Sequence, residues 1–284
     1  MNAPAQSPAY AIAPGDLETL IRLAKAEAGI ALDSRRRDFL VTRLAPRIAA
    51  LGLGSVAEYA ALLRGPARTG EIPAFVEALA THTTSFFREN AQYVWMSEAG
   101  IPALLDAASR QTRELTIWSA ACSTGQELYS ALMTADTAAR DAETPVGICG
   151  IGTDLSRRVL ALCERAVYSG EEIEPVPLEM RRRYLLSAAD GTPRHRIVPD
   201  LRARTRWHRA NLVETRQLPR IRADIAMLRN VLIYFDPPTR DRVVANVLER
   251  LAPGGFLLTG HAETLDAARW GLVQIRPSIY RKAE

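Results

Sequence analysis

Cysteine, lysine and long apolar runs are all scarce in this sequence. Its 284 residues include only three cysteines, Cys122, Cys149 and Cys163, which form neither a CxxC pair nor a metal-ligand spacing. No apolar stretch reaches the ~18 residues that a membrane-spanning helix needs, and residues 1–15 lack the basic start and apolar core of a secretory signal. These absences argue against a disulfide scaffold, a metal centre and membrane insertion, and we expect a cytoplasmic protein with reduced thiols.

Positive charge is carried almost entirely by arginine, since Lys25 and Lys282 are the only lysines. The net charge of +4 and the pI near 9.1 permit an acidic partner without identifying one. Arginine binds carboxylates and phosphates through two hydrogen bonds, although a coding bias toward arginine explains its excess equally well. With 48% hydrophobic and 24% charged residues, the chain has enough apolar material for one large or two modest packed domains.

The first part of the chain is predicted to be a mobile tail followed by an all-α domain. Residues 1–15 are rich in alanine and proline, and residues 16–80 carry apolar side chains at helical spacing. The second helix holds a set of arginines opposed there by Asp38 alone, and Pro46 is expected to kink or interrupt it. The predicted helices begin at Asp16, span Ser34–Leu51, open at the capping box that starts at Ser55, and span Pro73–Ala80.

Strand-like runs alternate with helical ones later in the chain. The strands are expected at Glu114–Ala120, Val146–Thr153, Asp224–Arg229, Phe256–Gly260 and Val273–Tyr280, with helices over Arg157–Tyr168 and Thr239–Leu251. This alternation predicts an α/β fold, with a doubly wound, mostly parallel Rossmann-like sheet over residues 99–284 and a linker over residues 81–98.

One arginine-rich stretch interrupts the alternation. Nine arginines lie between Arg181 and Arg209, and the runs Arg194–Val198 and Thr205–His208 predict a small antiparallel β insertion near residues 190–210. Such an insertion either docks a partner or presents a solvated basic face.

Two acidic residues are placed where open α/β sheets bind ligands. Glu127 follows the small-residue turn after the first strand, and Asp154 ends the second strand, so both are expected at the carboxyl edge of the sheet. The sequence has no GxGxxG and no GxxxxGK[ST], which disfavours NAD and a phosphate loop. A carboxylate for ribose hydroxyls and a second for an ammonium group, without a phosphate site, match the composition of S-adenosylmethionine.

Further polar residues follow at the same predicted edge. Thr83, Thr84 and Ser85 are expected to cap a helix whose first turn contains Arg88, an unfavourable place for a cation unless an anion accompanies it. Arg229, Asn230 and Tyr234 follow the third strand, and Asn211-Leu212 precede it and are placed to reach a purine edge.

Six sequence blocks in this order resemble the chemotaxis receptor methyltransferases of the CheR family, and the resemblance covers residues 16–284. The blocks are TTSFFR (Thr83–Arg88), WSAACSTGQELYS (Trp118–Ser130), GTDLS (Gly152–Ser156), NL (Asn211–Leu212), LRNVLIYFD (Leu228–Asp236) and LAPGGFLLTGHAE (Leu251–Glu263).

The resemblance implies a protein-glutamate O-methyltransferase that uses S-adenosylmethionine, releases S-adenosylhomocysteine and modifies cytoplasmic helices of chemoreceptors in sensory adaptation. Arg88 and Tyr234 would be nearest the methyl group, and the small β-subdomain would match one that binds a receptor C-terminal peptide in some members. Cofactor contacts would come from His82, Thr84, Arg88, Glu127, Asp154, Asn211, Leu212, Leu228, Arg229 and Asn230. The basic helix, with Arg35, Arg36, Arg43 and Arg47, would meet acidic receptor helices.

Several alternatives stay open at this point. His82 replaces the family's usual asparagine, which puts one cofactor hydrogen bond in doubt. A methyltransferase of the same fold acting on RNA or a small molecule is disfavoured because no aromatic stacking platform or RNA module is present. A non-catalytic adaptor is disfavoured because Arg88, Glu127, Asp154 and Tyr234 are all retained. We expect a monomer, no metal and no nucleic-acid partner.

Overall fold

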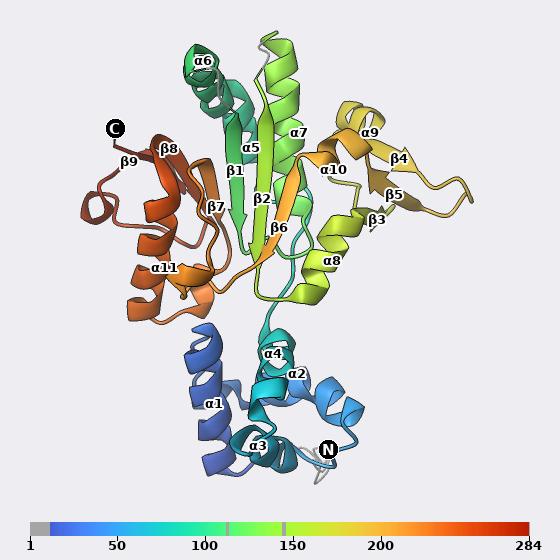
Figure 1. Cartoon of the computed structure of the whole chain (residues 1–284), viewed down its shortest axis with the longest axis vertical. Helices are drawn as coiled ribbons and strands as arrows, with labels where there is room; N and C mark the ends of the chain where they lie inside the picture. Colours follow the sequence, from blue (N-terminus) through green and yellow to red (C-terminus); the bar gives the residue numbers. More distant parts are fainter. Residues whose placement is uncertain (1–11, 112–113, 144–145, 284) are drawn as a thin grey trace, which may run out of the picture. The chain divides into compact units, whose positions relative to one another are not determined.

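The computed structural model describes residues 12–111, 114–143 and 146–283, which form two compact units (Figure 1). The first unit contains the chain up to Thr81 together with Tyr234–Arg240, and the second contains His82–Ile233 and the chain from Asp241 onward. Of the expected tail, residues 1–11 lie outside the described residues. Within the described ranges, no helix has both the length and the apolar character needed to cross a membrane.

The first unit is built from short helices around a small apolar core. Ser55 caps α3 as predicted, because its hydroxyl accepts a hydrogen bond from the Glu58 amide at 3.2 Å. Its helices are α1 (Pro14–Ala28), the 3-10 turn η2 (Ser34–Arg36), α2 (Arg37–Ala50), α3 (Val56–Arg64) and α4 (Arg68–Leu79). Fully buried side chains in this core include Leu20, Leu40, Leu44, Tyr59 and Phe75.

Pro46 and Pro73 both lie inside helices of this unit, so the expected interruption at Pro46 does not occur, a kink there stays a prediction, and the expected helix start at Pro73 is wrong. Helix α2 continues through Pro46, and α4 begins at Arg68, five residues before Pro73. A proline removes one helical hydrogen bond and leaves a carbonyl four residues earlier without its partner. Pro46 and Thr42 both lie on the exposed side of α2, and Pro73 is exposed on α4, so the freed carbonyls face away from the core.

The segment Tyr234–Arg240 is part of this unit although it is distant in sequence. The Ala31 amide donates to the Tyr234 carbonyl at 2.8 Å, and Ile30 forms a β-bridge with Phe235. Lys25 forms an ion pair with Asp236 at 2.6 Å. Tyr234, a predicted catalytic residue, therefore lies in a segment anchored to the helical unit.

The second unit contains a seven-stranded, mostly parallel sheet, which confirms the predicted fold class. The strand order is β6-β2-β1-β7-β8-β10-β9, and β6, β2, β1, β7 and β8 are parallel. The strands are β1 (Leu115–Ala120), β2 (Ile148–Asp154), β6 (Thr205–Arg209), β7 (Ala223–Leu228), β8 (Leu251–Thr259), β9 (Leu272–Arg276) and β10 (Ile279–Lys282). The chain moves outward from β1 to β2 and β6, then returns to the other side of β1 as β7, so strand order reverses beside β1.

Helices pack on this sheet. Helix α7 packs on β1 and β2, and α8 packs on β2 and β6. The helices are α5 (Ala91–Trp95), a π-helical turn η3 (Met96–Gly100), α6 (Ile101–Gln111), α7 (Gln126–Asp141), α8 (Arg157–Arg165) and α11 (Pro237–Arg250). The segment predicted as one strand at Val273–Tyr280 is instead the β9–β10 hairpin, and α8 ends three residues before the predicted Tyr168.

The small antiparallel insertion exists and includes the predicted run Arg194–Val198 as one strand, but the predicted run Thr205–His208 is not part of it. It consists of β3 (Val167–Ser169), β5 (Arg194–Ile197) and β4 (Leu185–Ser187), with α9 (Leu178–Tyr184) and α10 (Pro199–Ala203) beside it. The run Thr205–His208 pairs instead with β2 as a parallel strand, with Trp207 opposite Gly152. A Cβ on Gly152 would lie 2.2 Å from the Trp207 ring, so the glycine makes room for this strand.

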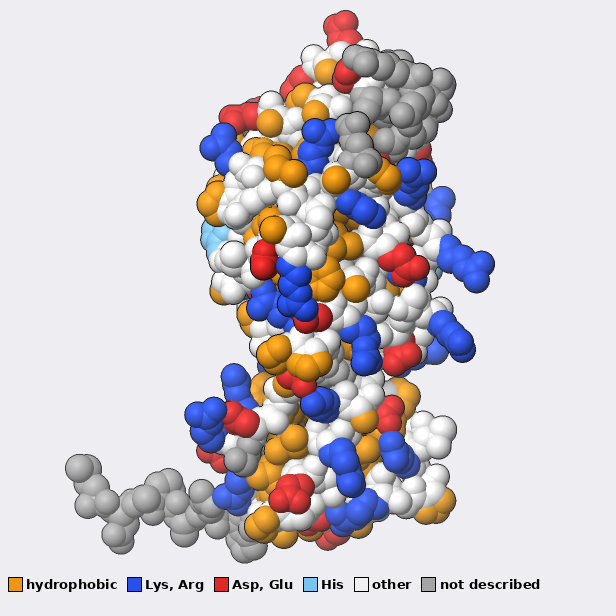
Figure 2. Space-filling view, turned by 90° about the vertical axis from the view of Figure 1, so that its left-hand side faces the viewer, with side chains coloured by type: hydrophobic (Ala, Val, Ile, Leu, Met, Phe, Trp, Pro, Cys, Tyr) orange, Lys and Arg blue, Asp and Glu red, His pale blue; other side chains and the backbone are white. Residues whose placement is uncertain are grey.

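Several arginines of the stretch from Arg181 to Arg209 stabilise the fold itself. The guanidinium groups of Arg181, Arg196, Arg202 and Arg209 donate to backbone carbonyls of Val176, Arg165, Ile197 and Leu155, respectively. These contacts give four of the nine arginines a role within the chain. On the face shown in Figure 2, basic side chains are interspersed with acidic ones rather than gathered in one patch.

Candidate cofactor and active site

The carboxyl ends of β1, β2 and β7 lie at the same edge of the sheet, and the loop after β1 has an unusual backbone there. Ala121 and Ser123 have φ values of 90° and 50°, in the left-handed region that disfavours residues other than glycine, and Gly125 follows with φ 93°. Such conformations cost about 1–3 kcal/mol each and are concentrated at ligand-binding loops. This loop leads directly into α7.

Asp154 is the last residue of β2 and holds this loop in place. Its Oδ2 accepts the Ser123 amide at 2.9 Å, and its Oδ1 accepts the Ser156 amide at 3.0 Å. Burial raises the pKa of Asp154, and these amide hydrogen bonds act in the opposite direction. Each carboxylate oxygen has a second lone pair, so the group retains capacity to accept hydrogen bonds from a ligand.

Glu127 lies in the first turn of α7, as predicted. Its Oε1 accepts the Ser119 hydroxyl at 2.7 Å, and its Oε2 pairs with Arg229 at 3.0 Å. Burial raises the pKa of Glu127, whereas Arg229 favours the ionised carboxylate. The sequence did not predict that a buried arginine would accompany this carboxylate.

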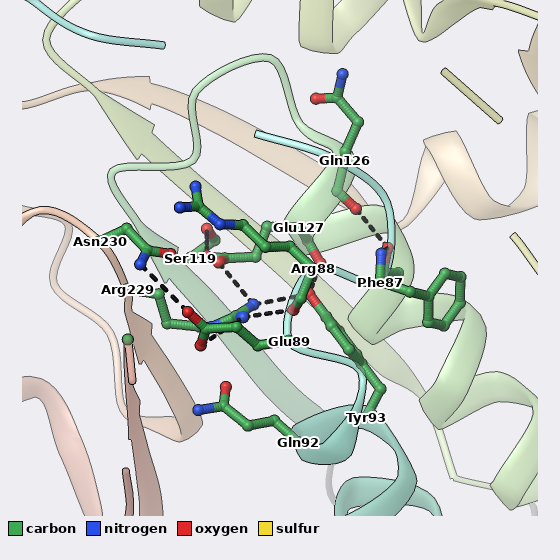
Figure 3. Close-up of polar contacts among 12 residues, drawn as sticks. Phe87, Arg88, Glu89, Gln92, Tyr93, Ser119, Gln126, Glu127, Arg229 and Asn230 are labelled. Carbon is green, nitrogen blue, oxygen red and sulfur yellow. Dashed lines mark hydrogen bonds and ion pairs between the residues drawn. The ribbon is translucent and has the colours of Figure 1, made fainter. Parts of the chain in front are cut away.

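Arg229 occupies the centre of the polar network, and Figure 3 shows it between the two carboxylates. Its side chain is fully buried and pairs with Glu89 at 3.1 Å and Glu127 at 3.0 Å. It also donates to the Tyr93 hydroxyl at 3.0 Å and to the Arg88 carbonyl. Burial alone would lower the pKa of Arg229, but the carboxylates raise it. The guanidinium therefore ties β7 to α7 and to the segment around Arg88.

The segment containing Arg88 is a tight turn and not the start of a helix. Phe87 and Glu89 have φ values of 52° and 58°, and α5 begins only at Ala91, without a side-chain cap. The prediction that Thr83–Ser85 cap this helix is wrong, because buried Phe86 and Phe87 anchor a turn there instead. The Phe87 amide donates to Ser130 at 3.0 Å, and Arg88, half-buried, donates to the Thr83 carbonyl at 3.0 Å.

The other residues that were predicted to bind the cofactor lie at or near this edge of the sheet, and their side chains differ in exposure. The His82 carbonyl accepts the Ser123 hydroxyl at 2.8 Å, and Thr84 is partly exposed. Asn211 and Leu212 are buried after β6, where the Asn211 side chain accepts the Val213 amide at 3.0 Å. Leu228 ends β7 with its side chain in the core, and Asn230 has φ 55°.

The predicted receptor-binding arginines and Tyr234 belong to the helical unit. Arg47 makes two hydrogen bonds to Glu71, at 2.8 and 2.6 Å, and Tyr59 also donates to this carboxylate. Arg43 donates to Thr81 at 3.2 Å. Arg35 pairs with Asp33 at 2.7 Å and stays exposed, as does Arg36. Asp38 is thus not the sole acid near these arginines, because Glu71 and Asp33 pair with two of them.

Sequence reasoning missed Glu89, Tyr93 and Glu263 as members of the network. Glu89 follows Arg88 directly, and Glu263 ends the block LAPGGFLLTGHAE, so both were close to recognised motifs. No spacing rule indicated that their carboxylates would converge with Arg229 and Asn230.

The groups at this edge fit S-adenosylmethionine. Asp154 offers acceptor capacity to ribose hydroxyls, and Glu127 with Ser119 offers oxygens to an ammonium group. The strained backbone of Ala121 and Ser123 is consistent with a loop that a ligand contacts closely. Among the described residues, no cluster of His, Cys, Asp and Glu could hold a metal ion.

Comparisons with known families cover nearly all of the described chain. Residues 82–277 match the family described as "CheR methyltransferase, SAM binding domain", and residues 15–80 match "CheR methyltransferase, all-alpha domain". The boundary between these two matches falls between residues 80 and 82, where the two compact units also divide.

Curated relatives show the same similarity over most of their length. The chain is 34% identical over 271 residues to "Chemotaxis protein methyltransferase 2" of Pseudomonas aeruginosa, covering 94% of this chain and 91% of that protein. It is 32% identical to "Chemotaxis protein methyltransferase" of Escherichia coli, covering 89% and 85%. A solved N-methyltransferase, NodS from Bradyrhizobium japonicum, is 14% identical with a TM-score of 0.35 over 64% of this chain and 85% of that one, too distant to support an argument.

Proposed function

This chain belongs to the CheR methyltransferase family, and on that premise we propose that it methylates glutamate side chains on the cytoplasmic helices of chemoreceptors. The product is a methyl ester, and the modification contributes to sensory adaptation in chemotaxis. When bound, S-adenosylmethionine supplies an electrophilic methyl group. The observation that carries the proposal is the connection between Arg88 and Glu127 through the buried guanidinium of Arg229.

A carboxylate acceptor suits the groups at this site. The unperturbed pKa of glutamate is ~4.3, so it is ionised at neutral pH and needs no general base. The chain's task is then to align the carboxylate and to exclude water from it. This requirement agrees with a site made of arginines, carboxylates and hydroxyls.

Each part of the site has a proposed task. Asp154 holds the ribose hydroxyls, Glu127 and Ser119 hold the ammonium group, and Asn211 with Leu212 borders the adenine. Arg88 orients the substrate carboxylate, because its backbone is fixed by Arg229 while its side chain stays partly accessible. Thr84, His82, Leu228 and Asn230 complete the cofactor contacts, Leu228 through its backbone because its side chain is buried. For Tyr234, in the helical unit, the proposed role is the one that the family resemblance implies, next to the methyl group.

The receptor is proposed to contact both units. Exposed Arg35 and Arg36, with Arg43, are suited to acidic receptor helices, whereas Arg47 is occupied by Glu71. In the small sheet, β4 is an edge strand with Leu186 half exposed, which suits the pairing of an extended receptor C-terminal peptide. The protein would act in the cytoplasm as a monomer.

The experiment is a methylation assay with methyl-labelled S-adenosylmethionine and a cytoplasmic receptor fragment. A carboxyl ester releases labelled methanol in alkali, whereas methylated RNA or amines do not. Arg88→Ala should lower kcat at least tenfold, and Arg276→Ala, which removes an exposed arginine on β9, should leave it unchanged. Alkali-stable label, or full activity of Arg88→Ala, would contradict the proposal.

A further inference from the structure

Glu263 is a buried carboxylate that holds the two loops at the carboxyl ends of β7 and β8 together. Glu263 is only 1% exposed. Oε2 accepts the amides of Asn230 at 2.6 Å and Gly260 at 2.9 Å, and Oε1 accepts the Ile233 amide at 3.3 Å. A single side chain thus satisfies three backbone donors at this edge of the sheet.

The packing around Glu263 leaves no room for a side chain at Gly260. A Cβ on Gly260 would lie 2.7 Å from Glu263 Oε2 and 2.9 Å from the Asn230 amide nitrogen. Asn230 itself is in the left-handed region with φ 55°, a conformation that asparagine adopts more readily than most residues other than glycine. In this conformation the Asn230 amide donates to the Glu263 carboxylate.

A short series of contacts connects this arrangement to Arg88. The Asn230 side chain donates to Glu89 Oε1 at 3.3 Å, and the His261 amide donates to the same oxygen at 3.4 Å. The other oxygen of Glu89 pairs with Arg229, which donates to the Arg88 carbonyl. The loop fixed by Glu263 therefore supports the turn that carries Arg88.

We propose that Glu263 is a positioning residue of the methyl-transfer site, which keeps the loop after β7 in the conformation that places Asn230, Arg229 and, through Glu89, Arg88. It acts through these residues and contacts neither substrate nor cofactor. The proposal rests on the proposed function, since the site it positions is the one that binds S-adenosylmethionine.

The test compares Glu263→Gln with a matched control, Asp224→Asn. Asp224 is also 1% exposed and accepts a backbone amide, that of Thr116 at 2.8 Å, but it lies at the amino end of β7. In Glu263→Gln an NH₂ group replaces one of the two acceptor oxygens, and the remaining amide oxygen is a weaker acceptor because it carries no full charge. Amide hydrogen exchange at Asn230, Ile233 and Gly260 in the ligand-free protein should therefore accelerate about tenfold or more.

Two further readouts separate positioning from general stability. S-adenosylhomocysteine, used as the probe, should bind Glu263→Gln about tenfold more weakly than the wild type, and the kcat of this variant should fall. Asp224→Asn should keep the wild-type affinity and the wild-type kcat, even if its Tm drops by as much as that of Glu263→Gln. The double variant Asn230→Ala/Glu263→Gln should lose no more affinity for S-adenosylhomocysteine, and no more of its kcat, than the more damaging of the two single variants. The reason is that both substitutions act through the same loop. Glu263→Asp, which keeps the charge, provides a second variant should Glu263→Gln fail to fold, and should show the same loss in milder form.

The outcomes distinguish this proposal from the proposed function. Wild-type protein that binds no S-adenosylhomocysteine would overturn the proposed function, and the positioning role with it. Wild-type binding combined with unchanged affinity and kcat in Glu263→Gln, or with losses fully additive to those of Asn230→Ala, would overturn the positioning role alone.

Discussion

Arg229 and Glu127 form an ion pair 3.0 Å long that joins the carboxyl end of β7 to the first turn of α7. The same guanidinium pairs with Glu89 and donates to the Arg88 carbonyl, so one buried side chain fixes three segments of the site. A buried guanidinium between two carboxylates also means that the site and the stability of the sheet unit depend on the same residue.

Replacement of Arg229 by methionine should therefore destabilise the protein strongly. Glu89 and Glu127 would remain buried without their cation, and breaking a buried pair costs about 3–5 kcal/mol. Urea unfolding followed by circular dichroism measures this loss, and Arg276→Met serves as an exposed control. A loss of less than about 1 kcal/mol in the free energy of unfolding, which is the usual value of a surface ion pair, would show that the network is open to water.

Gly152→Ala should be destabilising because of β6. The added methyl would lie 2.2–2.3 Å from the Trp207 ring and 3.1 Å from Cys122 Sγ, and overpacking of this kind costs about 1–3 kcal/mol. Gly70→Ala is the matched control, since nothing lies within 4 Å of its Cβ position in α4, and it should stabilise by roughly 0.5–1 kcal/mol. Equal Tm values for the two variants would contradict the parallel β6–β2 pairing.

Two arginines of the helical unit should respond differently to removal. Arg47→Ala leaves Glu71 and Tyr59 without their cation and should lower Tm, whereas Arg36→Ala, on an exposed turn, should leave Tm unchanged. If Arg36 contacts the receptor, its removal should raise KM for the receptor fragment without lowering kcat. Thermal unfolding and steady-state methylation measure the two effects, and the reverse pattern would contradict this division of roles.

The pair Lys25–Asp236 should give the helical unit a pH dependence at low pH. The hydrogen bond from Lys25 lowers the pKa of Asp236 to about 2, below its usual 3.8. Because the folded pKa is the lower one, this stabilisation is fully present above about pH 4 and is lost as the pH falls toward 2. NMR titration of the Asp236 carboxyl should show the pKa return toward 3.8 in Lys25→Met but not in Arg22→Met, which removes an exposed cation from the same helix.

The sequence predicted the fold where regular patterns decide it. Alternating strands and helices indicated a parallel sheet, and Glu127 and Asp154 were placed at its edge because each directly follows or ends a strand. The partner of β6 could not be predicted, since pairing of Thr205–His208 depends on the space that Gly152 leaves for Trp207. The turn at Phe86–Asn90 was missed because burial of both phenylalanines outweighs the capping preference of Thr83–Ser85.

The polar network around Arg229 could not be predicted from the sequence for a similar reason. Glu89, Arg229 and Glu263 come from three separate loops, and only tertiary packing brings their charges together. The contact between Arg229 and a cofactor stays a prediction, and the feature that the sequence did not indicate is the burial of its guanidinium between two carboxylates.

The most direct test of the account is calorimetric titration of the protein with S-adenosylmethionine and S-adenosylhomocysteine, repeated on Asp154→Ala. The account predicts saturable binding of both compounds to the wild type and its loss, or at least a tenfold weakening, in Asp154→Ala. The variant should keep its circular dichroism spectrum. No binding to the wild type, or equal binding to Asp154→Ala, would contradict the assignment of the cofactor site to the carboxyl ends of β1, β2 and β7.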